Sequence, residues 1–305
     1  MLGSGRIAIV TDDPGWHGAR LRQAFKSRGF DSTYLSLKSC HIDLSHSAHG
    51  IVIPGFGRNL PDGVFVRGVP GGTLEQVVLR LDLLHALRDC GVPVYNDARA
   101  IERSVDKAMT SLLLQHSGVA TPATWVTEDA ARARAVLIRE AAAGHELVLK
   151  PLFGSQGEGL MRLRQGTEIP DSAAYNGVYY LQRFVDCGGD AWHDWRVFVI
   201  GGTARAAMLR RGKSWVNNVA QGAHCIKAEL DPDLRTLAEE ATRAVGMDYA
   251  GIDIIRDRHG TAYVLEVNSI PAWKGLQTVS EVNLALCLAE DFIARRLLPE
   301  LKAAG

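Results

Sequence analysis

The sequence predicts an α/β head followed by an α+β body, and three observations support this fold class. The first hundred residues alternate short apolar strands with amphipathic helices, a pattern typical of a parallel sheet covered by helices. From about residue 145 strands outnumber helices, which favours antiparallel sheets. No Pro/Gly-rich linker separates the two parts, so we expect them to pack together.

The head begins with the apolar strand Arg6–Val10. An amphipathic helix is expected over 16–28 and ends at Gly29, because glycine readily adopts the backbone conformation that closes a helix. A second helix over 73–90 has Thr73 as its cap and Gln76 three residues later, which is a capping-box spacing. Further strands are predicted at 31–35, 51–53, 64–66 and 92–95.

The body starts with two short helical stretches that end near Gly118, followed by an extended segment from Thr121 to Val126. The sequence divides most naturally into residues 1–97, 98–186 and 187–305. Helices are predicted at 128–143, 232–245 and 279–297. Strands are predicted at 146–150, 160–164, 178–184, 194–200, 203–210, 250–256 and 261–267.

Charge and composition exclude several classes of protein. The chain has 305 residues with 34 Lys+Arg and 34 Asp+Glu, so its formal net charge is zero, which argues against a general binder of nucleic acid or anionic membranes. It has no apolar run long enough to span a membrane and no signal-peptide pattern. Its five cysteines are scattered singly, as expected of reduced thiols. We therefore expect a cytoplasmic protein.

A glycine-rich loop, residues 154–159, follows an apolar strand that ends in Lys150 and leads into another strand. Glycines at Gly154 and Gly157 let backbone N–H groups approach phosphate oxygens, and a lysine adds positive charge. The pattern indicates a hairpin that covers phosphate, and a flexible surface turn is the alternative. It is not a dinucleotide fingerprint, because no helix follows the loop.

Asp253, Glu266 and Asn268 lie within two apolar strands near the C-terminus. Alternation places Glu266 and Asn268 on one face of their strand, and Asp253 joins them if the strands pair through a turn near Gly260. Oxygen ligands of this kind suit Mg²⁺, which binds nucleotide phosphates. Metal binding is the favoured interpretation, with mutually paired polar residues or a solvated sheet face as the alternative.

The order of these pieces resembles the ATP-grasp superfamily and, within it, the RimK-like amino-acid ligases. The match runs from about residue 95 to the C-terminus, and the first 95 residues fit the family's pre-ATP-grasp domain in type only. The residues that carry the resemblance are Asp106-Lys107, Leu147-Val148-Leu149-Lys150, Gly154-Ser155-Gln156-Gly157-Glu158-Gly159, Leu181-Gln182-Arg183-Phe184-Val185, Asp194-Trp195-Arg196, Arg210-Arg211, Asn217-Asn218, Ala250-Gly251-Ile252-Asp253-Ile254 and Leu265-Glu266-Val267-Asn268-Ser269.

The resemblance implies a three-domain ligase that holds ATP between two antiparallel sheets. It assigns Lys107 and Lys150 to the phosphates, Asp194 to the ribose, and Arg210 to the transferred phosphate, with Arg210 and Lys150 as catalytic groups. Asn218 would lie near the phosphates. The remaining implied contacts are the loop residues Gly154, Ser155, Gln156 and Gly157, the adenine hinge Gln182, Arg183, Phe184 and Val185, and the ligands Asp253, Glu266 and Asn268 for Mg²⁺, or alternatively Mn²⁺.

The implied activity is ATP- and Mg²⁺-dependent ligation of a carboxylate to an amine through an acyl phosphate. The expected partners are small molecules: an amino acid such as glutamate, and a cofactor precursor such as a pterin or a furan C1-carrier. Neither nucleic acid nor membrane is expected, and a homo-oligomer is left open. The alternatives are an ATP-grasp small-molecule kinase and a non-catalytic ATP-binding regulatory module.

The sequence departs from the RimK-like pattern at Val216 and Gln221, where relatives carry arginines that read an acidic substrate or phosphate. Trp215 and Trp273 flank the same region and offer flat apolar surface. This predicts a substrate with an aromatic or heterocyclic part and puts glutamate in question. In the alternative interpretation Trp273 belongs to the core, and the lost charge is supplied by Arg67, Arg210, Arg211 or Lys274.

Overall fold

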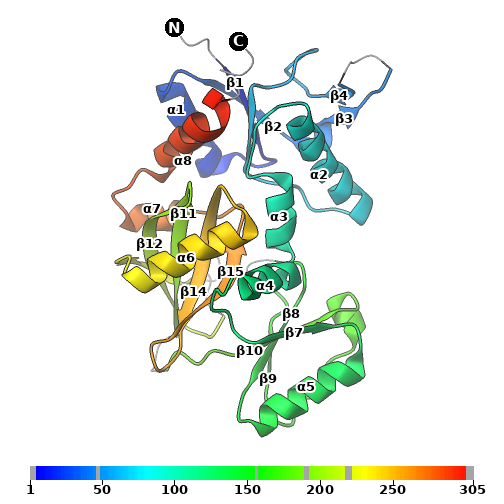
Figure 1. Cartoon of the computed structure of the whole chain (residues 1–305), viewed down its shortest axis with the longest axis vertical. Coiled ribbons are helices and arrows are strands. Elements are labelled where there is room, and N and C mark those ends of the chain that lie inside the picture. Colours follow the sequence, from blue (N-terminus) through cyan, green and yellow to red (C-terminus); the bar gives the residue numbers. More distant parts are fainter. Residues whose placement is uncertain (1–4, 46–48, 155–156, 189–191, 217–221, 300–305) are drawn as a thin grey trace.

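The computed structural model describes residues 5–45, 49–154, 157–188, 192–216 and 222–299 (Figure 1). Within them the chain forms a four-stranded parallel sheet, a four-stranded and a five-stranded antiparallel sheet, and a small two-stranded ladder. The predicted α/β head and α+β body are therefore confirmed. In Figure 1 the head and the central sheet lie at opposite ends of the long axis, with the C-terminal sheet between them.

The head is a four-stranded parallel sheet in the order β2-β1-β5-β6. Its strands are β1 (Arg6–Val10), β2 (Asp31–Leu35), β5 (Gly63–Val66) and β6 (Val94–Tyr95). Helices α1 (Gly15–Ser27) and α2 (Leu74–Asp89) connect them, and the predicted capping box of Thr73 and Gln76 is present. A short 3₁₀ turn (Leu37–Ser39) and the ladder of β3 (His41–Ile42) with β4 (Ile51–Val52) complete the head; β3 was not predicted.

The central part contains α3 (Ala98–Val105), α4 (Lys107–His116) and an antiparallel sheet in the order β7-β10-β8-β9. Helix α5 packs on this sheet, and the two share a core of their own that includes Leu137, Leu149 and Leu181. The bounds of the remaining elements are β7 (Thr124–Thr127), α5 (Ala130–Ala142), β8 (Leu147–Lys150), β9 (Met161–Leu163), a 3₁₀ turn (Ser172–Tyr175) and β10 (Tyr179–Arg183).

The C-terminal part is an antiparallel sheet in the order β13-β12-β11-β14-β15, with α6 packed on one face. Strand β13 was missed because it is half exposed and carries charged and polar side chains. The bounds are β11 (Trp192–Ile200), β12 (Thr203–Gly212), β13 (His224–Ala228), α6 (Pro232–Val245), β14 (Tyr249–Arg256), β15 (Ala262–Asn268), α7 (Lys274–Val279), α8 (Leu284–Phe292) and a π-helical turn (Ile293–Leu297).

The helix predicted over 279–297 is present, but it begins later than predicted: α8 and the π-helical turn cover 284–297, and a break at Ser280 to Asn283 separates them from α7. Asn283 causes the break: its backbone is extended, and its side chain accepts a hydrogen bond from the backbone N–H of Leu286 as an N-cap. Helix α8 then lies against α1 of the head (Figure 1). One core cluster consequently joins Ile7 and Phe25 of the head to Phe198 and Phe292 of the body.

The predicted division into three parts, with boundaries at residues 97/98 and 186/187, stays a prediction.

No helix in the described ranges is long and apolar enough to cross a membrane.

Candidate active site

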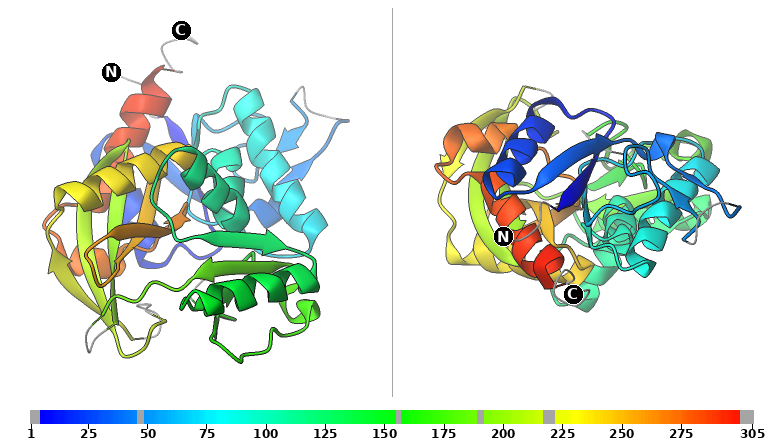
Figure 2. Two further views of the ribbon diagram at one scale, coloured as in Figure 1. Left: turned by 60° about the horizontal axis from the view of Figure 1, so that its bottom comes forward. Right: turned by 90° about the horizontal axis from the view of Figure 1, so that it is seen from above.

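A pocket of about 710 Å³ lies between the two antiparallel sheets, and residues of both line it. The central sheet contributes Val148 and Lys150 of β8 and Gln182 of β10. The C-terminal sheet contributes strands β11, β12, β14 and β15. The left view of Figure 2 shows the two sheets side by side, with the head behind them. A cavity therefore lies where the sequence predicted the site, between two antiparallel sheets.

Lys150, the last residue of β8, points its ammonium group into this pocket. Its Nζ donates a hydrogen bond of 2.6 Å to Oε1 of Gln182 on the neighbouring strand β10. Burial lowers the pKa of Lys150 to about 8, while the carboxylate of Glu266 acts in the opposite direction. Lys150 is thus a desolvated amine held in place by a neutral amide.

Lys107 is the second lysine of the pocket and opens α4 directly after its N-cap, Asp106. Its Nζ donates to the carbonyl oxygen of Gly154 at 2.9 Å, so it contacts the glycine-rich loop itself. Burial lowers the pKa of Lys107, and the carboxylate of Glu266 opposes this change. Lys107 and Lys150 therefore approach the same acidic side chain from two separate elements.

The predicted hairpin is present, because β8 and β9 pair antiparallel on either side of the glycine-rich loop, while its role in covering phosphate stays a prediction. Gly154 has a φ of +138° and Gly159 a φ of +70°, conformations that disfavour side chains. A Cβ at Gly159 would come within 2.8 Å of the ring of Pro151. Gly154 and Gly157 line the pocket, whereas the predicted contacts Ser155 and Gln156 lie outside the described residues.

The predicted oxygen ligands come together on one face of the β14–β15 pair. Asp253 lies directly opposite Glu266, and Asn268 lies opposite Gly251, so the predicted strand pairing is confirmed. The Nδ2 group of Asn268 donates to the carbonyl oxygen of Gly251 at 3.2 Å, which leaves its amide oxygen available as a ligand. No group of three or more His, Cys, Asp or Glu side chains suited to a metal gathers in the described ranges, so this set relies on an amide oxygen.

Asp253 also belongs to a buried ionic cluster with Asp194, Arg196 and Arg210. Arg196 Nη2 donates to Asp253 Oδ2 at 2.8 Å, and Arg210 Nη2 lies 3.0 Å from the same oxygen. Arg210 also donates hydrogen bonds to the carboxylate of Asp194 from both Nε and Nη2, and the Nε–Oδ1 distance is 3.0 Å. Strand register explains the cluster, because Asp194 lies opposite Arg210 on β12 and Arg196 lies opposite Asp253 on β14.

The pKa shifts in this cluster follow from burial and pairing. Burial raises the pKa of Asp194 despite the opposing effect of Arg210. Burial also acts to raise the pKa of Asp253, but Arg196 and Arg210 together hold it below its ordinary value. Burial and the charge of Asp253 raise the pKa of Glu266. Asp253 therefore loses its proton more readily than Glu266 does.

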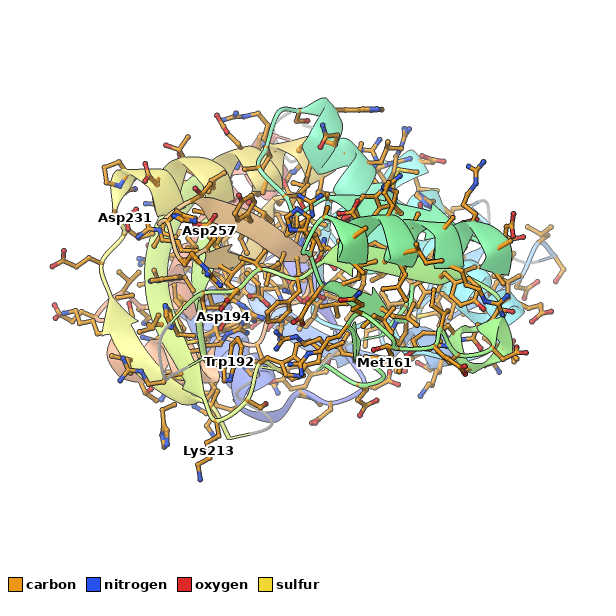
Figure 3. The ribbon with its side chains drawn as sticks, turned by 90° about the horizontal axis from the view of Figure 1, so that it is seen from below. Met161, Trp192, Asp194, Lys213, Asp231 and Asp257 are labelled. Carbon is orange, nitrogen blue, oxygen red and sulfur yellow. The ribbon has the colours of Figure 1, made fainter. Side chains whose placement is uncertain are left out.

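Arg196 was missed as a site residue, although the sequence carries a signal for it. Asp194 and Arg196 alternate with apolar residues along β11, so they share one face of a mostly buried strand. Charged residues in such a position are rarely buried unless they are paired. In Figure 3, Asp194 and Trp192 lie between the C-terminal sheet and Met161 of the central sheet.

The predicted adenine hinge, residues 182–185, lines the pocket in full. The guanidinium of Arg183 pairs with Glu140 of α5 at 2.6 Å. Phe184 forms edge-to-face contacts with Trp192 and Trp215, with ring centroids 5.9 and 6.0 Å apart. These rings give one end of the pocket an aromatic surface. Asn218, predicted near the phosphates, lies outside the described residues.

Trp273 does not offer its ring to the pocket, so its predicted role as a surface for an aromatic substrate is wrong. Its side chain is 0% exposed and belongs to the main core cluster, where it packs against His17, Phe198 and the guanidinium of Arg67. Trp273 lies in a loop where polar and apolar residues alternate, so the local sequence did not predict its burial. Residues of the head cover the segment after β15 and bury the ring. The core alternative for Trp273 is therefore correct.

His17 fixes the start of α7 from the head. Its Nε2 accepts hydrogen bonds from the backbone N–H groups of Trp273 and Lys274, at 3.0 and 3.2 Å. Burial, with the charges of Arg67 and Lys274, lowers the pKa of His17 to about 4. The neutral ring is the form that can accept these bonds, so protonation would release the loop.

We expect this depressed pKa to appear as a pH dependence of stability. Because an unfolded histidine titrates near its ordinary value of 6.5, the unfolded chain binds the extra proton between about pH 6.5 and 4, and the free energy of unfolding falls as the pH is lowered through that window. Urea denaturation of wild type and His17→Gln at several pH values measures this. The variant keeps an acceptor and should show a shallower fall; equal slopes would contradict the assignment.

Comparison with known proteins agrees with this architecture. Residues 104–292 match the family model described as RimK-like ATP-grasp domain, and residues 6–101 match the RimK PreATP-grasp domain. The tetrahydromethanopterin:α-L-glutamate ligase of Methanococcus maripaludis is 30% identical over 294 residues, covering 94% of this chain and 97% of the relative. The enzyme of the same description from Methanocaldococcus jannaschii is 38% identical over 225 residues, covering 70% of this chain and 74% of the relative.

Solved structures show the same fold at lower sequence identity. The ATP-grasp ligase PsnB complexed with its minimal precursor superposes with a TM-score of 0.73 at 18% identity, covering 96% of this chain and 99% of that one. The D-cycloserine synthetase DcsG gives a TM-score of 0.67 at 20% identity, with 95% and 99% covered. Together with the pocket between two antiparallel sheets and its two lysines, these matches show that the chain belongs to the RimK-like ATP-grasp family of ligases.

Proposed function

We propose that this ligase joins the amino group of L-glutamate to a carboxylate of a reduced pterin cofactor, with MgATP as the energy source, in the cytoplasm. The observation that carries the proposal is the carboxylate of Glu266. It lies on the pocket wall within electrostatic reach of Lys107 and Lys150, and no hydrogen-bond or ion-pair partner holds it among the residues the structure describes. The relatives named as tetrahydromethanopterin:α-L-glutamate ligases support the choice of substrates.

The residues present fit a magnesium ion. Glu266 and the amide oxygen of Asn268 are oxygen donors, and Asp253 retains lone pairs beyond those used by Arg196 and Arg210. We propose that these three side chains hold Mg²⁺, or Mn²⁺ in its place. When bound there, the ion would neutralise charge on the ATP phosphates.

The chemistry needs no nucleophile from the protein. A substrate carboxylate oxygen attacks the γ-phosphorus of ATP, ADP leaves, and an acyl phosphate forms. The amine nitrogen then attacks the acyl carbon, the C–O bond to phosphate breaks, and amide, phosphate and a proton result. Lys107, Lys150 and Arg210 supply positive charge along this path, and Asp194 holds Arg210 in position. We further propose that the 182–185 segment binds adenine, that Asp194 faces the ribose, and that the glycine-rich loop excludes water from the acyl phosphate.

Product analysis tests the proposal. Protein is incubated with MgATP, tetrahydromethanopterin and L-glutamate, with each substrate omitted in turn. We expect ADP and phosphate in equal amounts only when both organic substrates are present, and a glutamyl-pterin by mass spectrometry. A phosphorylated product formed with one substrate alone would instead establish the kinase alternative. Binding of ATP without turnover under any combination would establish the regulatory module.

A further inference from the structure

Several cations line the pocket, and the partners of each one show which of them remains free. The lysines and arginines among the described lining residues are Lys107, Lys150, Arg183, Arg196, Arg210 and Lys274. An acidic substrate that leaves water needs a cation of its own. Val216 lines the pocket without charge, so a cation for such a substrate has to come from another lining residue.

Most of these cations already have a polar or acidic partner within the protein. Arg183 pairs with Glu140, and Arg196 and Arg210 pair with Asp253 and Asp194. Lys107 and Lys150 face Glu266 and contact the glycine-rich loop and Gln182. They are the cations assigned above to the phosphates.

Two cations named as alternatives lie outside the pocket lining. Arg67 is behind the loop that follows β15: its Nη1 donates to the carbonyl oxygen of Pro271 at 3.1 Å, and its guanidinium covers the ring of Trp273. Arg211 is the exposed neighbour of Arg210 on β12 and is absent from the described lining. Neither is placed to receive a substrate in this pocket.

Lys274 is different, because its backbone is fixed and its side chain is free. The backbone N–H donates to His17, and the preceding residue, Trp273, is locked in the core. The side chain is exposed and lines the pocket, and no hydrogen bond or ion pair engages its ammonium group among the described residues. A cation on a rigid support loses little conformational freedom in the backbone when it binds an anion.

We propose that Lys274 binds a substrate carboxylate that is not phosphorylated, and that it thereby selects an acidic amino acid as the amine substrate. This rests on the proposed ligase function. The carboxylate that becomes the acyl phosphate is served by Lys107, Lys150 and Arg210. A second carboxylate, on the incoming amino acid, therefore needs the remaining cation.

Steady-state kinetics of Lys274→Gln test the proposal. L-Glutamate is varied at saturating MgATP and tetrahydromethanopterin, and the pterin is varied at saturating L-glutamate. We expect the KM for L-glutamate to rise about ten- to a hundredfold, the range for a hydrogen bond to a charged group, and Lys274→Arg to recover most of the loss. L-Glutamine should be a poor substrate for wild type, and Lys274→Gln should discriminate far less between the two amino acids.

Lys213→Gln is the matched control, because it removes the same charge from an exposed lysine outside the pocket lining. Lys213 extends away from the ribbon in Figure 3. Its KM values should equal those of wild type. The dissociation constant for Mg-AMPPNP, measured by calorimetry, and the melting temperature should be unchanged in both Gln variants, which separates substrate recognition from nucleotide binding and folding.

The possible outcomes are distinct. A rise in KM for the pterin alone would overturn the role of Lys274 in selecting the amino acid, because the contact would then be made to the pterin. Unchanged KM values for both substrates in Lys274→Gln, with wild type active, would overturn the role of Lys274 and leave the ligase function standing. If wild type forms no amide, the proposed function and this inference both fall.

Discussion

Glu266→Gln abolishes Mg²⁺-dependent ATP turnover, by an expected factor of at least about a hundred, while the protein remains folded. The substitution preserves the shape of the side chain and removes the charge that faces Lys107 and Lys150. Because a metal ion stabilises the transferring phosphate by several kcal/mol, weakening its ligand should cost about that much in activation free energy. ADP release at saturating substrates, measured over a range of Mg²⁺ concentrations, checks this.

Glu229→Gln serves as the control for this experiment. Glu229 is exposed and does not line the pocket, so the same change of charge there should leave turnover unaffected. The melting temperature of Glu266→Gln should not fall, because no partner among the described residues depends on this carboxylate for a hydrogen bond. Full turnover in a folded Glu266→Gln protein would end the assignment of Glu266 as a metal ligand.

Trp273→Ala destabilises the fold by about 3–5 kcal/mol, the range for truncating a large buried aromatic side chain. Its ring is fully buried and contacts residues of both the head and the C-terminal sheet, so the cavity would open where the two meet. Urea denaturation monitored by circular dichroism measures the loss. A stability equal to wild type together with a raised KM would restore Trp273 to the substrate pocket.

Trp215→Ala provides the comparison. Trp215 is only half-buried, lines the pocket and contacts Phe184, so its loss should change stability much less than the loss of Trp273. The two variants together separate an aromatic residue of the core from one on the pocket wall.

Features that depend on local pattern were predictable from the sequence. The apolar strand of residues 6–10 and helix 232–245 have the predicted bounds, and the capping box of Thr73 marks the start of α2. The pairing of Asp253 with Glu266 followed from alternation and a short turn. In each of these cases the residues that determine the structure are neighbours in sequence or across one hairpin.

Features that depend on distant partners were not predictable. The burial of Trp273 is produced by His17 and Arg67, more than two hundred residues away, and the pairing of Arg196 with Asp253 spans 57 residues. The polar strand β13 is held by its neighbour β12 rather than by an apolar face of its own. No periodicity within a single segment reports such contacts.

The packing of α8 on α1 determines where the chain could be cut into fragments and which parts could move relative to each other. The main core cluster draws on both ends of the sequence, whereas the cluster beneath α5 contains only residues between 125 and 181. A fragment cut between the two family domains, near residue 102, would expose Phe198, Tyr249 and Phe292 to water. The head and the C-terminal sheet are thus one mechanical unit, whereas the central sheet and α5 have a core that neither of them shares.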